Sequence, residues 1–340
     1  MLSRLDGYFA GARRVCIAVH QHPDGDALGS ATALGGYLRE LRGSSAVVIV
    51  PDRYPESLDF LAREGEVIIA SEESGRAGKT IDGCDLLVCL DLNSLSRTGA
   101  LEDAVRSARC PKLMIDHHPG PEREDFDLVF SETEISSASE LLYSILMEMP
   151  DIEGDARRFP ARVALSLMAG MTTDTNNFAN STYPSTLVMA SRLIEAGVDR
   201  DALLSLLYNR YRENRFRAMG FYLQTRLHIT QQGVAYAVFS AEDFSSLGLG
   251  EGETEGFVNL PLGIERVKMS IFLREDGDIF RVSVRSKKGW SSNALARACF
   301  NGGGHECAAG GRLRATSREE AERYIEEVTA RFLQDTAPAE

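Results

Sequence analysis

The chain has 340 residues, of which 44% are hydrophobic and 26% are charged, so it is long enough for about two domains with ordinary cores. Its formal net charge of −13 argues against a protein that grips long duplex nucleic acid, because such proteins present basic surfaces to the phosphates. No stretch approaches the roughly 20 uninterrupted apolar residues of a membrane span, and the N-terminal segment lacks the apolar centre of a signal peptide. We therefore expect a cytoplasmic protein with no membrane partner.

The first half of the sequence alternates short β-branched runs with helical patterns. Buried strands are predicted at Val15–Val19, Val47–Val50, Val67–Ala70, Leu86–Leu90 and Leu113–Ile115. Helices are predicted over Ser30–Leu41 and Ser137–Met149, and the second opens with the Ser137 and Glu140 spacing of a capping box. Continuous apolar strands separated by helices indicate a parallel sheet covered on both faces, so we predict an α/β domain over residues 1–185.

The second half changes character after a helical segment. Residues 186–224 are rich in Leu, Arg and Tyr and are predicted to form a helical linker. Two hairpins are predicted after it, one from Leu227–Thr230 and Val234–Phe239, the other from Met269–Arg274 and Ile279–Arg285. With a closing helix over Ser317–Phe332, residues 225–335 are expected to form a smaller α/β domain with a mixed sheet.

The six cysteines do not indicate a zinc or disulfide framework. None belongs to a CxxC pair, and most lie inside apolar, strand-like runs. We expect buried, reduced thiols.

Four separated segments end in side chains that bind metal ions. They are VCIAVHQHPDGDALGS with His20, Asp24 and Asp26, LLVCLDLN with Asp91, KLMIDHHPG with Asp116, His117 and His118, and ALSLMAGMTTDTNNF with Asp174. In open α/β sheets, bound molecules lie outside the carboxyl ends of the strands. Three of these four clusters directly follow predicted strands, so they are expected at that end of the sheet. A set of Asp and His ligands that contains no cysteine thiolate suits Mn²⁺ or Mg²⁺ better than a structural zinc ion. The carboxylates suffice for two ions, which at a separation of about 3.5–4 Å would clamp a phosphoryl group.

The alternative for each segment is an ordinary turn. An aspartate after a strand, such as Asp91, is more often a turn residue or a helix cap, and HxxPDxD on its own is compatible with a capped loop. Adjacent histidines at a strand end are rarer. We favour a metal site because random turns would not place His or Asp so consistently at the ends of buried segments.

The motifs also carry a family resemblance. HQHPDGDALGS, DLN, DHHPG and MTTDTNNF follow the order of the four motifs of the DHH phosphoesterase superfamily, and FNGGGHECAAG is similar to the signature of the DHH-associated C-terminal domain. Within the superfamily, the chain resembles the branch of nano-RNases and adenosine 3′,5′-bisphosphate (pAp) phosphatases. In the fourth motif, Asn176 and Asn177 replace the Gly that often follows Asp-Thr in the family. The sequence therefore does not indicate which substrate contacts this segment makes.

The resemblance implies a role for each metal ligand and catalytic residue. Two divalent ions, Mn²⁺ in our expectation, would be bound by His20 and Asp24 on one side, by Asp26, His117 and Asp174 on the other, and by Asp91 as the bridge. The nucleophile would be a bridging water with a lowered pKa. His118 would contact the scissile phosphate or assist the leaving group, and Asp116 would orient a neighbouring histidine.

The same resemblance assigns substrate recognition to the C-terminal half. It implies that Arg285, Ser286, Gly303, Gly304 and His305 contact the phosphate and base of the substrate. A planar guanidinium and a close backbone approach at glycines suit a phosphate. On its own, a glycine run is more often a flexible turn.

These expectations combine into a metal-dependent phosphoesterase that hydrolyses short oligoribonucleotides, the 3′-phosphate of pAp, or both. Linear or cyclic dinucleotides are alternative substrates, and pyrophosphate and polyphosphate are less favoured. A non-catalytic nucleotide-binding module is a further alternative, but such a protein would be expected to lack a metal ligand, and every ligand position is kept here. The sequence leaves open which substrate is preferred, the cleavage polarity, the choice of RNA or DNA, and the oligomeric state, for which we consider a homodimer.

Overall fold

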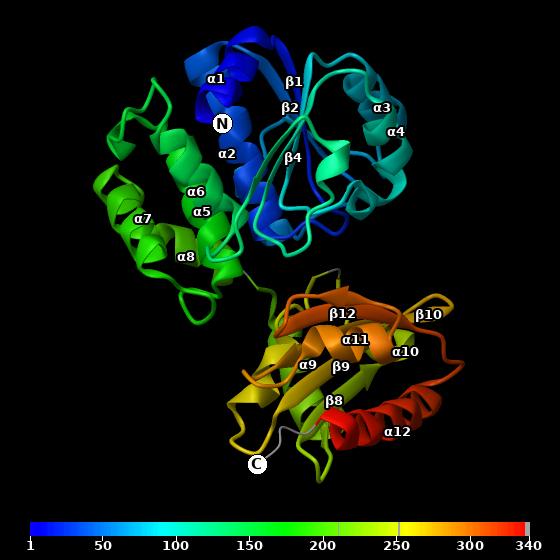
Figure 1. Cartoon of the computed structure of the whole chain (residues 1–340). Helices are drawn as coiled ribbons and strands as arrows, with labels where there is room; N and C mark the ends of the chain where they lie inside the picture. The colour runs from blue at the N-terminus through cyan, green and yellow to red at the C-terminus, as the bar shows by residue number, and fades with distance from the viewer. Residues whose placement is uncertain (210, 251, 337–340) are drawn as a thin grey trace. The chain divides into compact units, whose positions relative to one another are not determined.

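The chain folds into two compact units. The computed structural model describes residues 1–209, 211–250 and 252–336, and contacts divide the chain into an N-terminal unit, Met1–Arg210, and a C-terminal unit, Tyr211–Glu340 (Figure 1). The helices expected as a linker over residues 186–224 are shared between these units. Leu193 and Leu207 pack into the N-terminal core, whereas Ala218 packs into a core of the C-terminal unit.

A parallel sheet organises the N-terminal unit. Its strands lie in the order β3 (Val67–Ile69), β2 (Ser45–Val50), β1 (Arg14–Ala18), β4 (Leu86–Leu90), β5 (Lys112–Asp116) and β6 (Leu128–Ser131). All neighbouring strands are parallel. The predicted α/β class is confirmed. The edge strand β6 was not predicted, because its four residues are half-exposed at one end and follow an acidic segment.

Helices cover both faces of this sheet, as Figure 1 shows. They are α1 (Leu2–Gly11), α2 (Gly25–Arg42), α3 (Ser74–Asp82), α4 (Glu102–Ser107), α5 (Ala138–Met147), α6 (Ala161–Asp174), α7 (Pro184–Glu195) and α8 (Arg200–Tyr208). Val15 and Ile17 of β1 join the core beneath α2, α5 and α6, whereas Cys16 and Ala18 join the core beneath α3 and α4. Burial of both sides explains why the strands are continuously apolar.

A mixed sheet organises the C-terminal unit. Its order is β11 (Gly303–Gly304), β12 (Ala308–Leu313), β10 (Ile279–Ser286), β9 (Met269–Asp276), β8 (Val234–Phe239) and β7 (His228–Ile229), and its helices are α9 (Glu213–Phe221), α10 (Ala241–Ser246), α11 (Ser292–Cys299) and α12 (Arg318–Thr336). Both predicted hairpins are present, and β8 and β9 join them in parallel. The predicted glycine loop instead forms the short strand β11 in part.

Short turns of 3-10 or π-helix complete both units. They are η1 (Glu56–Leu61), η2 (Leu95–Leu101), η3 (Arg123–Asp125), η4 (Ala156–Arg158), η5 (Tyr222–Arg226) and η6 (Phe257–Gly263). No helix in the described ranges combines the length and apolarity needed to cross a bilayer. The six cysteines are free thiols, of which Cys16 and Cys89 are buried.

The close crossing of α2 and α6 brings two chain segments together at the functional end of the sheet. A Cβ atom at Gly29 would lie 2.8 Å from both Gly170 N and Ser166 O, so the two backbones touch with no room for a side chain. The N-terminus of α2 lies at the C-terminus of α6, since a Cβ at Gly25 would collide with the Thr173 side chain. This crossing sets Asp26 and Asp174 beside each other.

Gly29→Ala should therefore destabilise the N-terminal unit. The added methyl meets backbone atoms that cannot rotate away, and overpacking of this kind costs about 1–3 kcal/mol. Gly7→Ala is the matched control, because Gly7 is an exposed position of α1 with no atom within 4 Å of the new Cβ. Thermal unfolding of both variants measures the difference. A Gly29→Ala variant as stable as Gly7→Ala would contradict the tight crossing.

Candidate metal centre

The predicted metal-type side chains meet at the carboxyl ends of three adjacent strands. His20 follows β1, Asp91 follows β4, and Asp116 ends β5 directly before His117 and His118. Because β1, β4 and β5 are neighbours in one parallel sheet, their ends lie at the same edge. Asp91 has a left-handed backbone with φ of 57°, an uncommon conformation for a non-glycine residue that often marks a functional turn.

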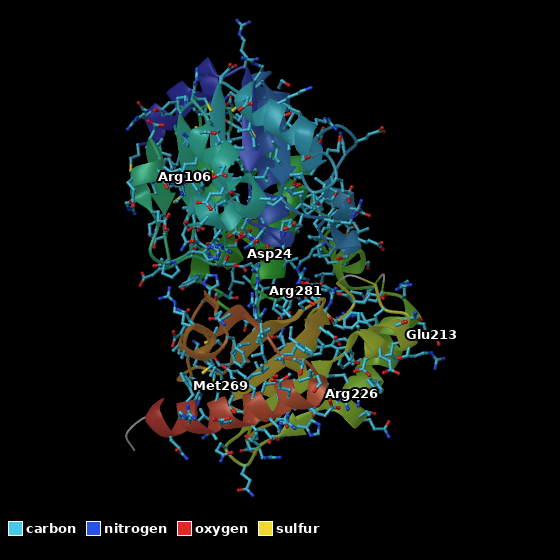
Figure 2. The ribbon with its side chains drawn as sticks, turned by 90° about the vertical axis from the view of Figure 1, so that its right-hand side faces the viewer. Asp24, Arg106, Glu213, Arg226, Met269 and Arg281 are labelled. Carbon is cyan, nitrogen blue, oxygen red and sulfur yellow. The ribbon has the colours of Figure 1, made fainter. Side chains whose placement is uncertain are left out.

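Two helix ends supply the remaining carboxylates. Asp24 is the N-cap of α2, and its Oδ1 accepts hydrogen bonds of 3.0 Å from the backbone amides of Asp26 and Ala27. Asp26 lies in the first turn of α2, and Asp174 is the last residue of α6. Asp24 is more exposed than the other ligands and is labelled in Figure 2.

One group of ligands forms around His20. Its Nε2 lies 3.4 Å from Asp91 Oδ2 and 3.9 Å from Asp24 Oδ1, and the three side chains can hold a single ion. The other ring nitrogen, Nδ1, donates a 2.8 Å hydrogen bond to Gln21 O. A carbonyl can only accept, so this bond fixes the tautomer that leaves the Nε2 lone pair for a metal.

A second group forms around His117. Its Nε2 lies 3.4 Å from Asp91 Oδ1, 3.6 Å from Asp174 Oδ2 and 3.9 Å from Asp26 Oδ2. Asp26, Asp91 and His117 again form a set able to hold one ion. Asp91 belongs to both groups, with one carboxylate oxygen facing each histidine.

Asp116 holds His118 beside these groups. Its fully buried carboxylate accepts a 2.8 Å hydrogen bond from His118 Nδ1 and a 3.0 Å bond from His118 N. His118 Nδ1 is also 3.5 Å from Asp91 Oδ1. The two hydrogen bonds orient the imidazole, and Asp91, Asp116 and His118 form a further group of potential ligands.

Backbone amides of α5 hold Asp26, a contact that the sequence motifs did not reveal. Asp26 accepts hydrogen bonds from Ala138 N at 2.7 Å and Ser139 N at 2.9 Å, which are unpaired donors at the first turn of α5. Only half of the predicted capping box forms at this helix end. Ser137 accepts from Glu140 N at 3.0 Å, but the Glu140 carboxylate turns to Ser136 and to Thr186 of α7.

The electrostatics of the centre are those of carboxylates crowded together. Burial and the neighbouring Asp91 raise the pKa of Asp26 to about 7, and burial together with Asp26 raises the pKa of Asp174. Burial would raise the pKa of Asp91 as well, but His117 and His20 hold it well below its ordinary value. Burial opposes the charged form of His117, yet Asp91 raises its pKa to about 10. The raised pKa values of Asp26, Asp174 and His117 all reflect an excess of negative charge at this centre.

The residues present fit a divalent metal site. Within the described part of the chain, Asp91 Oδ1 is a buried oxygen without a hydrogen bond of proper geometry. It points into a set of carboxylate oxygens and imidazole nitrogens, the donors preferred by Mn²⁺ and similar ions. A buried anion of this kind needs a cation or a donor to offset its desolvation.

The predicted substrate residues lie in the C-terminal unit. Arg285 on β10 is half-buried, and its Nη1 donates to Val284 O at 3.0 Å and to Ala309 O at 3.4 Å. Gly304 N donates a 3.2 Å bond to Asn293 Oδ1, and His305 follows directly after β11.

Ser286 has a different environment from its neighbour Arg285. Its side chain is buried on the opposite face of β10, where Oγ donates to Trp290 O at 2.6 Å and bonds to Ser292 Oγ at 2.9 Å. This geometry does not favour the predicted substrate contact of its hydroxyl. Along β10 the apolar residues Phe280, Val282 and Val284 alternate with polar ones, and Ser286 is the next residue in the apolar series. This alternation was the sequence signal that the Ser286 side chain is buried.

Comparison with known proteins identifies the domains. Residues 14–171 match the N-terminal domain of the DHH family, and residues 231–332 match the DHHA1 domain. Two curated relatives carry the name bifunctional oligoribonuclease and PAP phosphatase NrnA. The protein of Bacillus subtilis is 30% identical over 316 residues, covering 91% of this chain and 92% of the relative. That of Thermus thermophilus is 31% identical over 320 residues, covering 92% and 89%.

Solved structures agree with this assignment. An exopolyphosphatase-related protein of Bacteroides fragilis superposes with a TM-score of 0.91 at 32% identity, covering 99% of this chain and 97% of that chain. RecJ of Thermus thermophilus, solved with Mn²⁺, shares the fold with a TM-score of 0.57 at 14% identity, covering 97% and 55%. The resemblance in the motifs is confirmed. The chain belongs to the DHH family, with a C-terminal DHHA1 domain, and is a hydrolase of phosphoric esters.

Proposed function

We propose that this hydrolase degrades very short oligoribonucleotides and removes the 3′-phosphate of pAp, using two divalent cations, with Mn²⁺ as the favoured ion. The observation that carries the metal part is the position of Asp91, one oxygen of which faces His20 and the other His117. The names of the two curated relatives support the substrate part, because the chain matches nearly their full length.

The N-terminal unit would hold the ions. One would be bound by His20, Asp24 and Asp91, the other by Asp26, Asp91, His117 and Asp174. When bound, such cations supply positive charge that lowers the pKa of a water and offsets charge on the phosphate. The α5 amides and Gln21 O keep Asp26 and His20 in a binding orientation without competing for the same lone pairs.

His118 is the proposed proton donor to the leaving oxygen. Asp116 accepts a hydrogen bond from its Nδ1, which orients the ring. The ring contacts His117 edge-on, with 4.8 Å between centroids, and this contact limits its rotation. His118 thus lies beside the metal ligands with a defined orientation.

The C-terminal unit is proposed to recognise a terminal phosphate. Arg285 on β10 supplies a guanidinium, Gly303 and Gly304 on β11 have no side chain to block an anion, and His305 after β11 supplies an imidazole; β12 lies between β10 and β11. A local anion site of this kind is compatible with a chain of net charge −13. Linear and cyclic dinucleotides, pyrophosphate and polyphosphate are the alternative substrates to be assayed beside oligoribonucleotides and pAp.

Activity should disappear on chelation and return with Mn²⁺. The assay is a product time course on a labelled ladder of oligoribonucleotides, from dinucleotide to decanucleotide, with pAp in parallel. Mn²⁺ affinity should also rise with pH from about 7 upward, because Asp26, with a pKa of about 7, and His117, with a pKa of about 10, must each lose a proton to bind the ion. Calorimetry in buffers of different ionisation enthalpy measures the released protons. Undiminished turnover after thorough chelation would contradict the proposal.

Asp91→Ala should abolish catalysis while leaving the fold intact. Loss of a residue that merely supports a metal ligand costs about 10–100-fold, and a bridging ligand should cost more. Asp103→Ala on α4 is the control, since it removes an exposed carboxylate away from the site. Circular dichroism checks folding, and Mn²⁺ titration counts the ions. Two bound ions and near-parental turnover in Asp91→Ala would show that the bridge is wrongly assigned.

Arg285→Ala and His305→Ala should leave Mn²⁺ binding unchanged but weaken substrate use. A lost charge-assisted phosphate contact is worth roughly 1.5–3 kcal/mol, so kcat/KM for a dinucleotide or pAp should fall about ten- to a hundredfold. Bis-p-nitrophenyl phosphate has no terminal phosphate monoester, so its hydrolysis should barely change. Equal losses on both substrates would assign these residues to the chemistry, and no loss on either would make them structural.

A further inference from the structure

Gly170 lies at the point where α2, α5 and α6 meet. The three helices pack against one another in the N-terminal unit (Figure 1). Gly170 is buried on α6, one turn before Asp174. On one side its backbone touches Gly29 of α2. On the other side, a Cβ atom at Gly170 would overlap Ser139 Oγ, and it would lie 2.8 Å from Asp26 Oδ1 and 2.9 Å from Ser139 Cβ. Side chains from α2 and α5 therefore occupy the space that a side chain at this position would need.

The two oxygens of the Asp26 carboxylate have different neighbours. Oδ1 accepts a 2.9 Å hydrogen bond from Ser139 N and lies beside the place that a Cβ at Gly170 would take. Oδ2 accepts from Ala138 N at 2.7 Å and lies 3.9 Å from His117 Nε2. Asp26 is only 1% exposed, so these protein neighbours determine its position. The carboxylate is thus set by the α5 amides and by the absence of a side chain at Gly170.

Ser139 fills the remaining space beside this carboxylate. Its side chain is fully buried, and within the described part of the chain its Oγ makes no hydrogen bond of proper geometry. Such a position does not favour a hydroxyl, because an unsatisfied buried polar group costs free energy. Packing is therefore what this side chain provides, since its Cβ and Oγ occupy the space beside Asp26 and Gly170.

A methyl group at position 170 would have to displace these neighbours. Rotation of the Ser139 hydroxyl does not make room, because Ser139 Cβ and Asp26 Oδ1 would still lie closer than the 3.4 Å of an ordinary contact. Moving Asp26 Oδ1 from 2.8 Å to 3.4 Å exceeds the roughly 0.5 Å within which a functional group must be held. The displacement would reach Oδ2, which faces His117, because both oxygens belong to one planar group.

We propose that Gly170 and Ser139 are positioning residues for the metal ligand Asp26. Gly170 leaves the space in which the carboxylate lies, and Ser139 fills the rest of it. Together they set the affinity for the cation held between Asp26 and His117. The inference rests on the proposed function and extends it to two residues that are not themselves ligands. They act through Asp26 and not on the substrate.

The first test is Gly170→Ala in the full-length protein. Calorimetric titration of the chelated protein with Mn²⁺ should show that one of the two cation sites binds about 10–100-fold more weakly than in the parent, the effect of losing a residue that supports a metal ligand. Turnover of a dinucleotide should fall at limiting Mn²⁺ and recover at saturating Mn²⁺, because the ligand itself is kept. A purely structural role would lower the melting temperature without this dependence on Mn²⁺ concentration.

The second test is compensation by Ser139→Gly. This change removes the side-chain atoms that a methyl group at position 170 would meet, but it keeps the backbone amide that donates to Asp26. Alone, it should weaken Mn²⁺ binding about tenfold, because the carboxylate loses the packing beside it. The double variant with Gly170→Ala should bind Mn²⁺ more tightly than Gly170→Ala alone, whereas independent losses would add.

Gly36→Ala is the matched control. Its new Cβ would lie 3.0 Å from Val163 Cγ2, so it also tightens the packing of α2 on α6, but it lies further along α2, away from Asp26. It should alter the melting temperature and leave Mn²⁺ affinity at the parental value.

Parental Mn²⁺ affinity in Gly170→Ala, the same loss in Gly36→Ala, or a double variant no better than Gly170→Ala would overturn the inference. If circular dichroism shows that Gly170→Ala does not fold, Ser139→Gly alone is the test, and parental Mn²⁺ affinity in that variant would overturn the inference. A parental protein that binds no Mn²⁺ would be a failure of the proposed function, and the inference would fall with it.

Discussion

The repulsion among buried carboxylates at one edge of the parallel sheet is the constraint on which the functional end of this protein depends. Asp26, Asp91 and Asp174 are drawn together by a strand end and a helix crossing, and burial raises the pKa of both Asp26 and Asp174. The raised pKa values of Asp26 and His117 reflect this excess of negative charge. The fold thus holds an anionic site under electrostatic strain, and divalent cations are the natural means of relieving it.

The rest of the N-terminal unit keeps this arrangement from relaxing. The backbone contact between α2 and α6 at Gly29 and Gly170 fixes the helix ends, so Asp26 and Asp174 cannot move apart. The backbone amides of Ala138 and Ser139 at the start of α5 donate hydrogen bonds to the Asp26 carboxylate and fix its position. Asp116 does the same for His118. Neither anchor is a cation, because Asp26 accepts from backbone amides and His118 donates to the Asp116 carboxylate, so neither competes with a metal ion for its ligands.

Sequence reasoning predicted the parts of this site that depend on local rules. The carboxyl ends of parallel strands meet at one edge of a sheet, so placing Asp91 and His117 directly after two strands was enough to predict that they meet. The α5 contact to Asp26 joins positions more than a hundred residues apart, and no local pattern contains it. A mixed sheet was predicted for the C-terminal unit, but no local pattern indicated that β8 and β9 are the strands that pair in parallel, although each hairpin was recognisable from its turn. The orientation of Ser286, by contrast, could have been inferred from the alternation along β10.

The central claim is that Asp91 joins two cation sites. The most direct measurement is a crystal structure of the full chain grown with Mn²⁺, using anomalous scattering to locate the ions. We predict two anomalous peaks, one beside His20 and Asp24 and the other beside Asp26, His117 and Asp174, with Asp91 coordinating both. A single peak, or two peaks of which only one contacts Asp91, would contradict this claim.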